Sequence, residues 1–240
     1  MSDASQSDRL GVVVVIPAFN EDQRIEATVT GAMSLPSVRA VVVVDDGSTD
    51  STSQAATAAG ATVVRHPRRR GKAAAMTSGA TAARAAGYAD EPLLFLDADL
   101  TDSARNAGPL IDAVLDGSAD MAIATIPRTG APAGHGFVVQ LSARGIERRT
   151  GWRPTQPLSG QRCMTRALFD RVVPLARGFG VETGLTIDAL AVGARVVECP
   201  VDIRHRETGR SWRDQWHRAK QYRDVRLALL RRRRRPSVAP

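Results

Sequence analysis

Runs of β-branched residues alternate along the chain with segments in which apolar residues recur every three or four positions. Residues 12–16 and residues 41–44 are continuous runs of Val and Ile, which predict strands buried on both faces of a parallel sheet. Between them, the apolar positions from residue 25 to residue 33 have the spacing of one helical face. The start of the chain therefore predicts a β-α-β unit.

The same alternation continues to about residue 126. Further strands are predicted at 61–65, 93–96 and 121–126. Further helices are predicted after the turn and cap residues 47–50, to about residue 59, at 72–86 and at 103–115. This order predicts an α/β protein with a Rossmann-like, mostly parallel sheet flanked by helices. Beyond residue 127 the pattern is less regular and predicts a smaller mixed region. Its expected helices are 137–149 and 182–192, and its expected strands are 158–164 and 195–199.

The composition fits a globular protein of this kind. With 240 residues, 43% of them hydrophobic, the chain can bury a sizeable core. No stretch approaches the roughly 18 apolar residues that span a bilayer, and the polar start of the chain does not resemble a signal peptide. We therefore expect a soluble, cytoplasmic protein with residues 1–10 as a flexible N-terminal segment. Cys163 and Cys199 have neither a zinc spacing nor a disulfide pattern.

The formal charge of +8 is concentrated near the C-terminus. Residues 204–235 contain 13 Lys and Arg against three acidic residues, a net +10, so the rest of the chain is −2. Apolar residues such as Trp216, Val225 and Leu229 recur at helical spacing, which predicts a basic amphipathic helix within residues 211–240. This helix either docks on the domain or binds an anionic membrane surface through residues 211–235. Nucleic-acid binding is the least favoured alternative.

Polar segments follow each of the first four predicted strands. They are Pro17-Ala18-Phe19-Asn20-Glu21, Asp45-Asp46-Gly47-Ser48, the stretch from His66 to Lys72, and Asp97-Ala98-Asp99. Ligands of open parallel sheets bind beyond the carboxyl ends of the strands, so these segments are expected to share one crevice. Turn and helix-cap chemistry explains any one of them, but it does not explain why all four strand ends carry such residues.

Four stretches of the chain, VVVIPAFNE, VVVDDGSTD, RGKAAAMTSG and LLFLDADL, are similar to the successive motifs of family 2 glycosyltransferases with the glycosyltransferase A fold. The likeness covers residues 11–102 and implies a role for each strand end. Lys72 is expected near the diphosphate, and Asp99 is expected to bind the divalent ion. Asp97, with Ala98 beside it, is expected to face the ribose or the metal. The residues expected to line the nucleoside pocket are Pro17, Ala18, Asn20, Glu21 and Asp46.

The Asp97-Ala98-Asp99 segment also suits a metal site on chemical grounds. Transfer from a nucleotide sugar expels a nucleoside diphosphate, and Mg²⁺ or Mn²⁺ held by one or two carboxylates neutralises the charge of that leaving group. Carboxylates two residues apart at a strand end point the same way, so Asp97 and Asp99 are expected to face one site. The alternative is that they cap the helix predicted from Ser103.

Three segments of the second half, QPLSGQ, GFGVE and RHR, are similar in order and spacing to those of glucosyl-3-phosphoglycerate synthases and related family 2 enzymes. The resemblance implies that His205 is a third metal ligand, the alternative being a surface histidine. It implies that Glu182 faces the acceptor hydroxyl as a base or an orienting group, the alternative being a carboxylate that caps its helix. The residues implied for the acceptor site are Leu158, Ser159, Gly160 and Gln161.

The sequence thus predicts a metal-dependent transfer of a hexose from a nucleotide diphosphate sugar of the UDP-glucose or GDP-mannose type. The expected acceptor is a polyprenyl phosphate or a small phosphorylated or hydroxylated molecule. The acceptor of the synthases is not carried over, because the chain lacks an obvious counterpart of their extended C-terminal part. A retaining transfer like theirs is the alternative to an inverting one. Residues 11–126 are assigned to the nucleotide-sugar-binding half and residues 127–210 to the acceptor-binding half. The competing hypotheses are a sugar nucleotidyltransferase and a basic membrane-surface adaptor with an inactive pocket, and a homodimer is kept open.

Overall fold

The computed structural model describes residues 11–125, 136–203 and 212–232, and for residues 212–220 it describes the backbone alone. The strands are β1 (Val12–Ala18), β2 (Val38–Asp45), β3 (Thr62–Arg65), β4 (Leu93–Phe95), β5 (Met121–Thr125), β6 (Arg162–Met164) and β7 (Val196–Pro200). The helices are α1 (Ile25–Met33), α2 (Thr52–Ala58), α3 (Lys72–Ala85), α4 (Gly108–Leu115), α5 (Gly136–Thr150), α6 (Arg166–Val172), α7 (Val181–Ala191) and α8 (Trp212–Arg231), with two short 3-10 helices, η1 (Thr101–Ala107) and η2 (Gly178–Gly180).

The described strands form one seven-stranded sheet in the order β3-β2-β1-β4-β6-β5-β7. Neighbouring strands run parallel except at β6, which is antiparallel to both β4 and β5. The predicted α/β class with a mostly parallel sheet is therefore confirmed. Strands from both sides of residue 127 share this sheet, and the division into a nucleotide-sugar half and an acceptor half stays a prediction.

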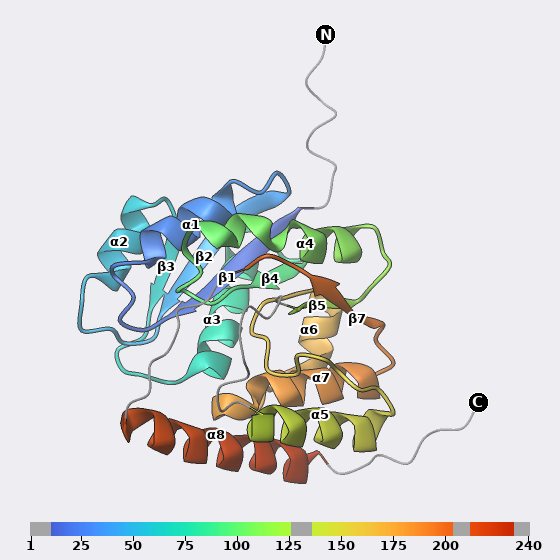
Figure 1. Cartoon of the computed structure of the whole chain (residues 1–240). Coiled ribbons are helices and arrows are strands. Elements are labelled where there is room, and N and C mark those ends of the chain that lie inside the picture. Colours follow the sequence, from blue (N-terminus) through green and yellow to red (C-terminus); the bar gives the residue numbers. More distant parts are fainter. Residues whose placement is uncertain (1–10, 126–135, 204–211, 233–240) are drawn as a thin grey trace.

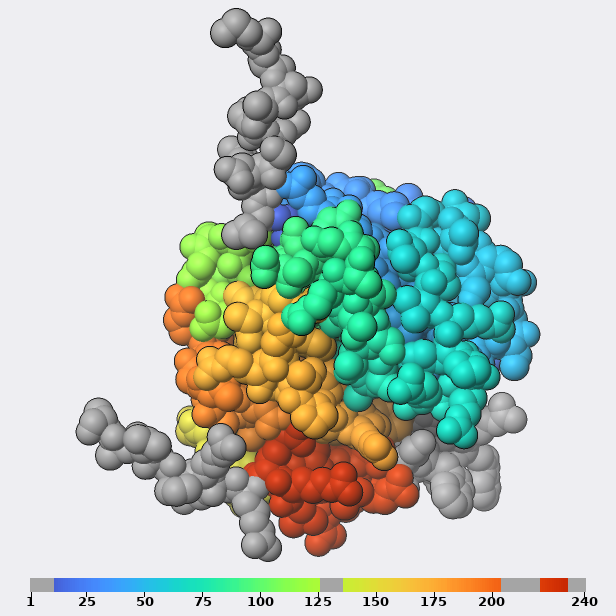
Figure 2. Space-filling model, turned by 180° about the vertical axis from the view of Figure 1, so that it is seen from behind, coloured from blue at the N-terminus to red at the C-terminus, as the bar shows by residue number. Residues whose placement is uncertain are grey.

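The continuous Val runs form central strands because both faces of the sheet are covered by helices (Figure 1). Along β1, Val12, Val14 and Ile16 enter a first core under α1, α2, η1 and α4. Val13 and Val15 enter a second core under α3, α6 and α7, and Figure 2 shows α3 beside the α6 region on that face. Each fully buried aliphatic side chain contributes about 1.5–3 kcal/mol, so β1 firmly fixes the sheet edge at which it ends.

Helices α5 and α8 form a further layer over α7, at the bottom of Figure 1. Val225 and Leu229 of α8 are buried there with Ile146 and Ile187 in a third core. A Cβ on Gly145 would lie 2.5 Å from the Leu229 side chain, so the two helices touch at this glycine. The described apolar stripe of α8 is therefore docked on the domain, as one of the two alternatives expected. The described helices include none that is both long and apolar enough to cross a bilayer.

Three details differ from the sequence predictions. The strand predicted at 158–164 shortens to β6, because the chain first turns where Ser159 N–H donates to Gln156 O at 3.1 Å. The helix predicted at 103–115 divides into η1 and α4 at Gly108. Helix α6 was not predicted, and it begins after Thr165, whose hydroxyl caps its first turn.

Candidate active site

The loops that follow β1 and β2 are joined by hydrogen bonds at the carboxyl edge of the sheet. Asn20 has a left-handed backbone with φ of 56°, which asparagine adopts more readily than most residues. Its N–H donates to Ser48 Oγ and its Oδ1 accepts from Thr49 N–H, both at 2.9 Å. Glu21 N–H donates to Thr52 Oγ1, also at 2.9 Å. Two of the residues predicted for the nucleoside pocket therefore lie where the first two strand ends meet.

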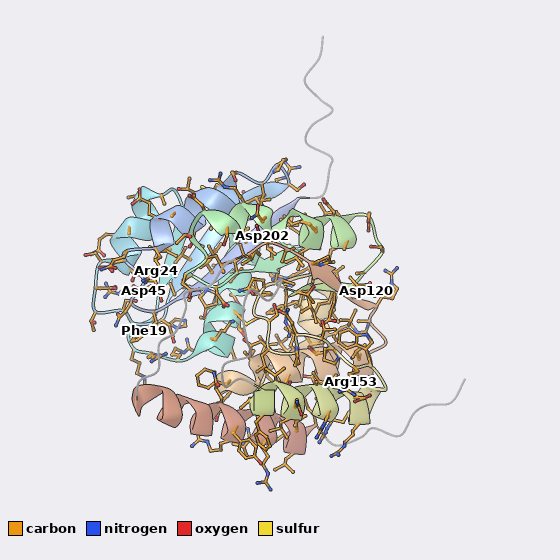
Figure 3. The ribbon with its side chains drawn as sticks, in the orientation of Figure 1. Phe19, Arg24, Asp45, Asp120, Arg153 and Asp202 are labelled. Carbon is orange, nitrogen blue, oxygen red and sulfur yellow. The ribbon has the colours of Figure 1, made fainter. Side chains whose placement is uncertain are left out.

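Pro17 and Ala18 are the last two residues of β1, and Ala18 O accepts from Asp46 N–H at 2.8 Å. The next side chain, Phe19, lies at the edge of the sheet (Figure 3). Arg69 covers its ring, with the guanidinium carbon 4.1 Å from the ring centroid, which is a cation–π contact. Sequence reasoning did not single out this pair, although an aromatic residue within the first strand-end segment was a signal for it.

The carboxylate of Asp46 forms hydrogen bonds with other groups of the protein. Its oxygens accept the N–H groups of Arg70 and Gly71 at 2.8 and 2.7 Å, and His66 Nδ1 lies 2.7 Å away. The other ring nitrogen of His66 lies 2.9 Å from Ser78 Oγ. Asp46 therefore holds the loop that leads into α3, and its contact with a nucleoside stays a prediction.

Asp45 is buried behind the same edge and fixes the turn after β2. Ser48 N–H donates to its Oδ1 at 2.8 Å, and the Ser53 hydroxyl donates to its Oδ2. Burial by itself raises the pKa of this carboxyl, but the hydrogen bonds from Ser48 and Ser53, with the nearby Arg65 guanidinium, lower it below its ordinary value. The charged Asp45 thus supports the loop that carries its neighbour.

Lys72, Asp97 and Glu182 form the centre of the site. The Lys72 ammonium lies 2.7 Å from Asp97 Oδ1 and 3.0 Å from Glu182 Oε1. Lys72 begins α3, Asp97 follows β4 and Glu182 lies in the first turn of α7, so three distant segments meet here. Burial lowers the pKa of Lys72, but the two carboxylates outweigh burial and raise it above its ordinary value. The ammonium is therefore charged at physiological pH.

The segment before β6 closes over this cluster. Gln161 Nε2 donates to Asp97 Oδ2 at 2.7 Å. A Cβ on Gly160 would lie 2.5 Å from Lys72 Nζ and 2.7 Å from Asp97 Oδ2, so glycine alone fits without displacing them. Leu158 instead packs against the third core. The predicted acceptor residues are thus divided, with Gly160 and Gln161 at the cluster and Leu158 in the layer of α5, α7 and α8.

Arg162, which sequence reasoning missed, lies buried beneath the same segment with 1% of its surface exposed. Its guanidinium donates to Ser159 O, Pro157 O and Thr186 Oγ1 at 2.9, 3.1 and 2.8 Å. Burial lowers the pKa of Arg162 to about 10, against the attraction of Glu182 and a second carboxylate. The arginine therefore fixes the backbone of the segment from below. A single arginine in a strand pattern gives no sign that it is buried.

Asp99 is half-buried between two buried neighbours. Ala98 and Leu100 pack in the first core, so the chain turns the intervening acid away from that core. Asp97 already contacts Lys72 and Gln161 through its two oxygens, which makes it less suited to bind an ion directly.

The metal ligands that the protein offers around Asp97 and Asp99 fit an ion that binds together with the phosphates of a substrate. Within the described ranges, no group of three or more His, Cys, Asp and Glu side chains is arranged to hold an ion. Mg²⁺ is commonly held by one or two carboxylates together with substrate phosphates, a set that Asp99 can begin. His205, the predicted third ligand, lies outside the described residues.

Comparison with known proteins identifies the family to which these motifs belong. Residues 13–173 match the model of glycosyl transferase family 2. The chain belongs to this family. Among curated relatives, it is 32% identical over 202 residues to the glucosyl-3-phosphoglycerate synthase of Mycobacterium tuberculosis and 33% identical over 202 residues to that of Mycolicibacterium paratuberculosis. These matches cover 74% of this chain, which spans only 60% and 59% of the length of the two relatives.

Solved structures extend the likeness of this family 2 protein to the whole fold. The M. tuberculosis glucosyl-3-phosphoglycerate synthase in complex with Mn²⁺, uridine diphosphate and phosphoglyceric acid aligns with a TM-score of 0.76 at 28% identity. The alignment covers 95% of this chain and 80% of that chain. Its complex with phosphoglyceric acid gives 0.74 at 29% identity, over 92% and 79%. The resemblance and the glycosyltransferase A fold predicted from the sequence are therefore confirmed.

The family 2 motifs meet at one edge of the sheet, as the strand-end pattern predicted. Direct contacts join Lys72, Asp97, Gln161 and Glu182, which lie up to 110 positions apart in the sequence. Glu182 lies in the first turn of α7 and also pairs with Lys72, a contact that a purely capping carboxylate would not need. The roles assigned to the individual residues stay predictions.

Proposed function

We propose that this chain is a metal-dependent glycosyltransferase that moves a hexose from a nucleoside-diphosphate sugar to a small phosphorylated or hydroxylated acceptor. The observation that carries the proposal is the meeting of Lys72, Asp97 and Glu182 beyond the carboxyl end of β4, in a chain of family 2. Ligands of open α/β sheets bind at such strand ends. The cluster combines an ammonium for a departing diphosphate with a carboxylate for an acceptor hydroxyl.

UDP-glucose is the donor we propose first. The M. tuberculosis relative has been solved with Mn²⁺, uridine-diphosphate-glucose and phosphoglyceric acid, which supports this choice and a small phosphorylated acceptor. The Phe19 ring offers an aromatic surface for a base beside the loops after β1 and β2. A GDP-mannose type of donor and a polyprenyl phosphate acceptor are kept as alternatives. The chain spans about three fifths of the length of its curated relatives. Membership of the family therefore does not carry the donor and acceptor with it, and both are proposals.

For the metal, we propose that Asp99, with Asp97 beside it, holds Mg²⁺ or Mn²⁺ together with the diphosphate. Such an ion would neutralise negative charge on the departing nucleoside diphosphate. Lys72 would add a second positive charge at the same place, since its ammonium already lies against Asp97. His205 is retained as a predicted further ligand.

For the acceptor, we propose that Glu182 orients its hydroxyl group or accepts the proton from it. The carboxylate is 13% exposed and is held by Lys72, so it faces the cluster with a defined position. A retaining transfer like that of glucosyl-3-phosphoglycerate synthases is the second candidate outcome. The likeness to those enzymes, which extends through both halves of the chain, favours it. The anomeric configuration of the product, read by proton NMR, distinguishes retention from inversion.

A panel of nucleotide sugars tests the proposed function. With Mn²⁺ and 3-phosphoglycerate, we expect release of UDP and formation of a glucosylated product from UDP-glucose, and loss of both when the metal is chelated. GDP-mannose and polyprenyl phosphate, offered in parallel, test the alternative donor and acceptor. Absence of binding and turnover with every nucleotide sugar would support the inactive-adaptor hypothesis. Formation of a nucleotide sugar and pyrophosphate from a nucleoside triphosphate and a sugar 1-phosphate, offered in a separate reaction, would support a nucleotidyltransferase.

We further propose that the outward face of α8 contacts an anionic membrane surface. Arg223, Arg226 and Arg231 are exposed on this helix, and Leu227 and Leu230 are 41% and 57% exposed between them. Figure 3 shows side chains tipped with nitrogen that project from the layer of α5 and α8, away from the sheet. Each basic residue near an anionic lipid surface adds roughly 1 kcal/mol, and exposed leucines can enter the headgroup region.

Liposome flotation tests this surface. The double variant R223E/R226E is expected to bind vesicles that contain anionic lipid at least about tenfold more weakly than the wild type, because two attractive charges become repulsive. The matched control R39E/R105E makes the same charge change at exposed positions away from α8 and is expected to float like the wild type. Equal losses in both variants would mean that net charge matters and that the α8 face does not. The cytoplasmic location and the homodimer stay predictions.

A further inference from the structure

The turn that carries Asp97 and Asp99 ends in a strained residue. Thr101, the first residue of η1, has a left-handed backbone with φ of 51°. A β-branched residue is rare in this region, because its Cβ crowds the carbonyl oxygen, at a cost of roughly 1–2 kcal/mol. Such a conformation persists only where the surroundings hold it, and strained residues of this kind gather at functional sites.

The hydroxyl of Thr28 holds this turn from α1. Thr28 is fully buried, and its Oγ1 donates to Ala98 O at 2.9 Å and accepts from Thr101 N–H at 2.8 Å. The alternative acceptor for the same hydrogen, Arg24 O, is farther away at 3.1 Å. One side chain therefore binds the backbone immediately before Asp99 and the backbone two residues after it.

Close packing against α1 completes the support. Ala98 and Leu100 are 6% and 0% exposed in the first core, on either side of Asp99. A Cβ on Gly31 of α1 would lie 3.2 Å from Thr101 O, so the helix approaches the turn at van der Waals distance. The turn is thus fixed by two hydrogen bonds and two buried side chains.

We propose that Thr28 is a positioning residue that sets the Asp99 carboxylate for a divalent ion and its diphosphate. This inference rests on the proposed function, in which Asp99 is the metal ligand. Thr28 is on α1, which packs in the first core, whereas Lys72 begins α3, which packs in the second core, and the Thr28 hydroxyl contacts backbone groups. Its hydroxyl acts through the backbone, in the way that groups behind a metal ligand commonly tune affinity.

Three threonine variants of one helix test the proposal. T28V keeps the shape of the side chain and removes the hydroxyl, T28S keeps the hydroxyl, and T30V makes the same change at an exposed position of α1. In calorimetry with Mn²⁺ and UDP, we expect T28V to bind the metal about tenfold more weakly, the low end of the effect of removing a group behind a metal ligand. T28S and T30V should bind it like the wild type. Equal affinity in T28V and the wild type, measured where both are folded, would overturn the proposal.

Amide hydrogen exchange supplies a readout that needs no ligand. The N–H of Thr101 should exchange faster in T28V than in the wild type, whereas T28S should protect it, because only the hydroxyl oxygen accepts this hydrogen. Unchanged exchange in T28V would show that Thr28 does not hold the turn. A wild-type protein that binds neither Mn²⁺ nor UDP would instead overturn the proposed function. Exchange at Thr101 would still decide whether the Thr28 hydroxyl holds the turn.

Discussion

Replacing Asp99 by alanine is expected to abolish the metal-dependent binding of UDP. In the wild type, calorimetry should show UDP binding that requires Mn²⁺ or Mg²⁺ and disappears with a chelator. Loss of a side chain that binds the metal directly should weaken this binding by about 100-fold or more. Removal of a group that only contacts such a side chain already lowers metal affinity by about 10- to 100-fold. Asp97 cannot easily substitute, because its oxygens contact Lys72 and Gln161.

A nearby acid provides the matched control for this variant. Asp102 lies three positions further on, its side chain is 77% exposed, and it pairs with Arg105 on the surface. D102A removes the same chemical group and should leave metal-dependent binding unchanged, because Asp102 lies outside the cluster. Tight binding without metal in D99A would overturn the assignment of Asp99, and equal losses in D99A and D102A would point to a general electrostatic effect.

Replacing Lys72 by methionine is expected to reduce transfer strongly while the fold persists. The ammonium lies between Asp97 and Glu182, where the proposed function puts the charge of the departing diphosphate. Removal of one such preorganised group typically costs about 10²- to 10³-fold in kcat. Steady-state kinetics with UDP-glucose should show this loss mainly in kcat, since the other contacts to the donor remain.

A second substitution separates catalysis from stability in this experiment. Without the ammonium, no positive charge lies between the carboxylates of Asp97 and Glu182, which then repel each other, so K72M should also unfold at a lower temperature. The double variant K72M/E182Q removes one of the facing charges and should recover thermal stability. Because Glu182 is itself proposed to act on the acceptor, kcat of the double variant is compared with that of E182Q and should be lower. Equal kcat in K72M/E182Q and E182Q would mean that Lys72 serves only the structure, and the catalytic proposal would then fail.

The sequence predicted the first half of the fold well because the signals there are local. A Val run such as residues 12–16 must be covered on both faces, and the polar residues directly after each run must lie at one edge of a parallel sheet. Asp97 and Lys72 were therefore expected near each other from their strand and helix positions alone. The spacing of the two acids predicted that Asp97 and Asp99 face one site, and this stays a prediction.

The second half was predicted less well because its contacts are not encoded in any local period. Strand β6 has three residues and takes its place from antiparallel pairing with both β4 and β5, which no alternation in so short a segment can signal. Arg162 reads as a polar strand residue until the sheet and α7 bury it. For the same reason, the sequence places Phe19 in the segment after the first strand but does not predict that the Arg69 side chain covers its ring.

The sequence by itself determined the α/β class, the order of the first strands and the chemical character of the carboxyl edge, since hydrophobic periodicity and strand-end residues act over a few positions. Only the tertiary structure decided that Glu182 meets Lys72, that Gly160 must lack a side chain against Asp97, and that Thr28 grips the turn around Asp99. These contacts join segments separated by 63 to 110 positions, and they form because two packed cores bring helices and loops to one strand end.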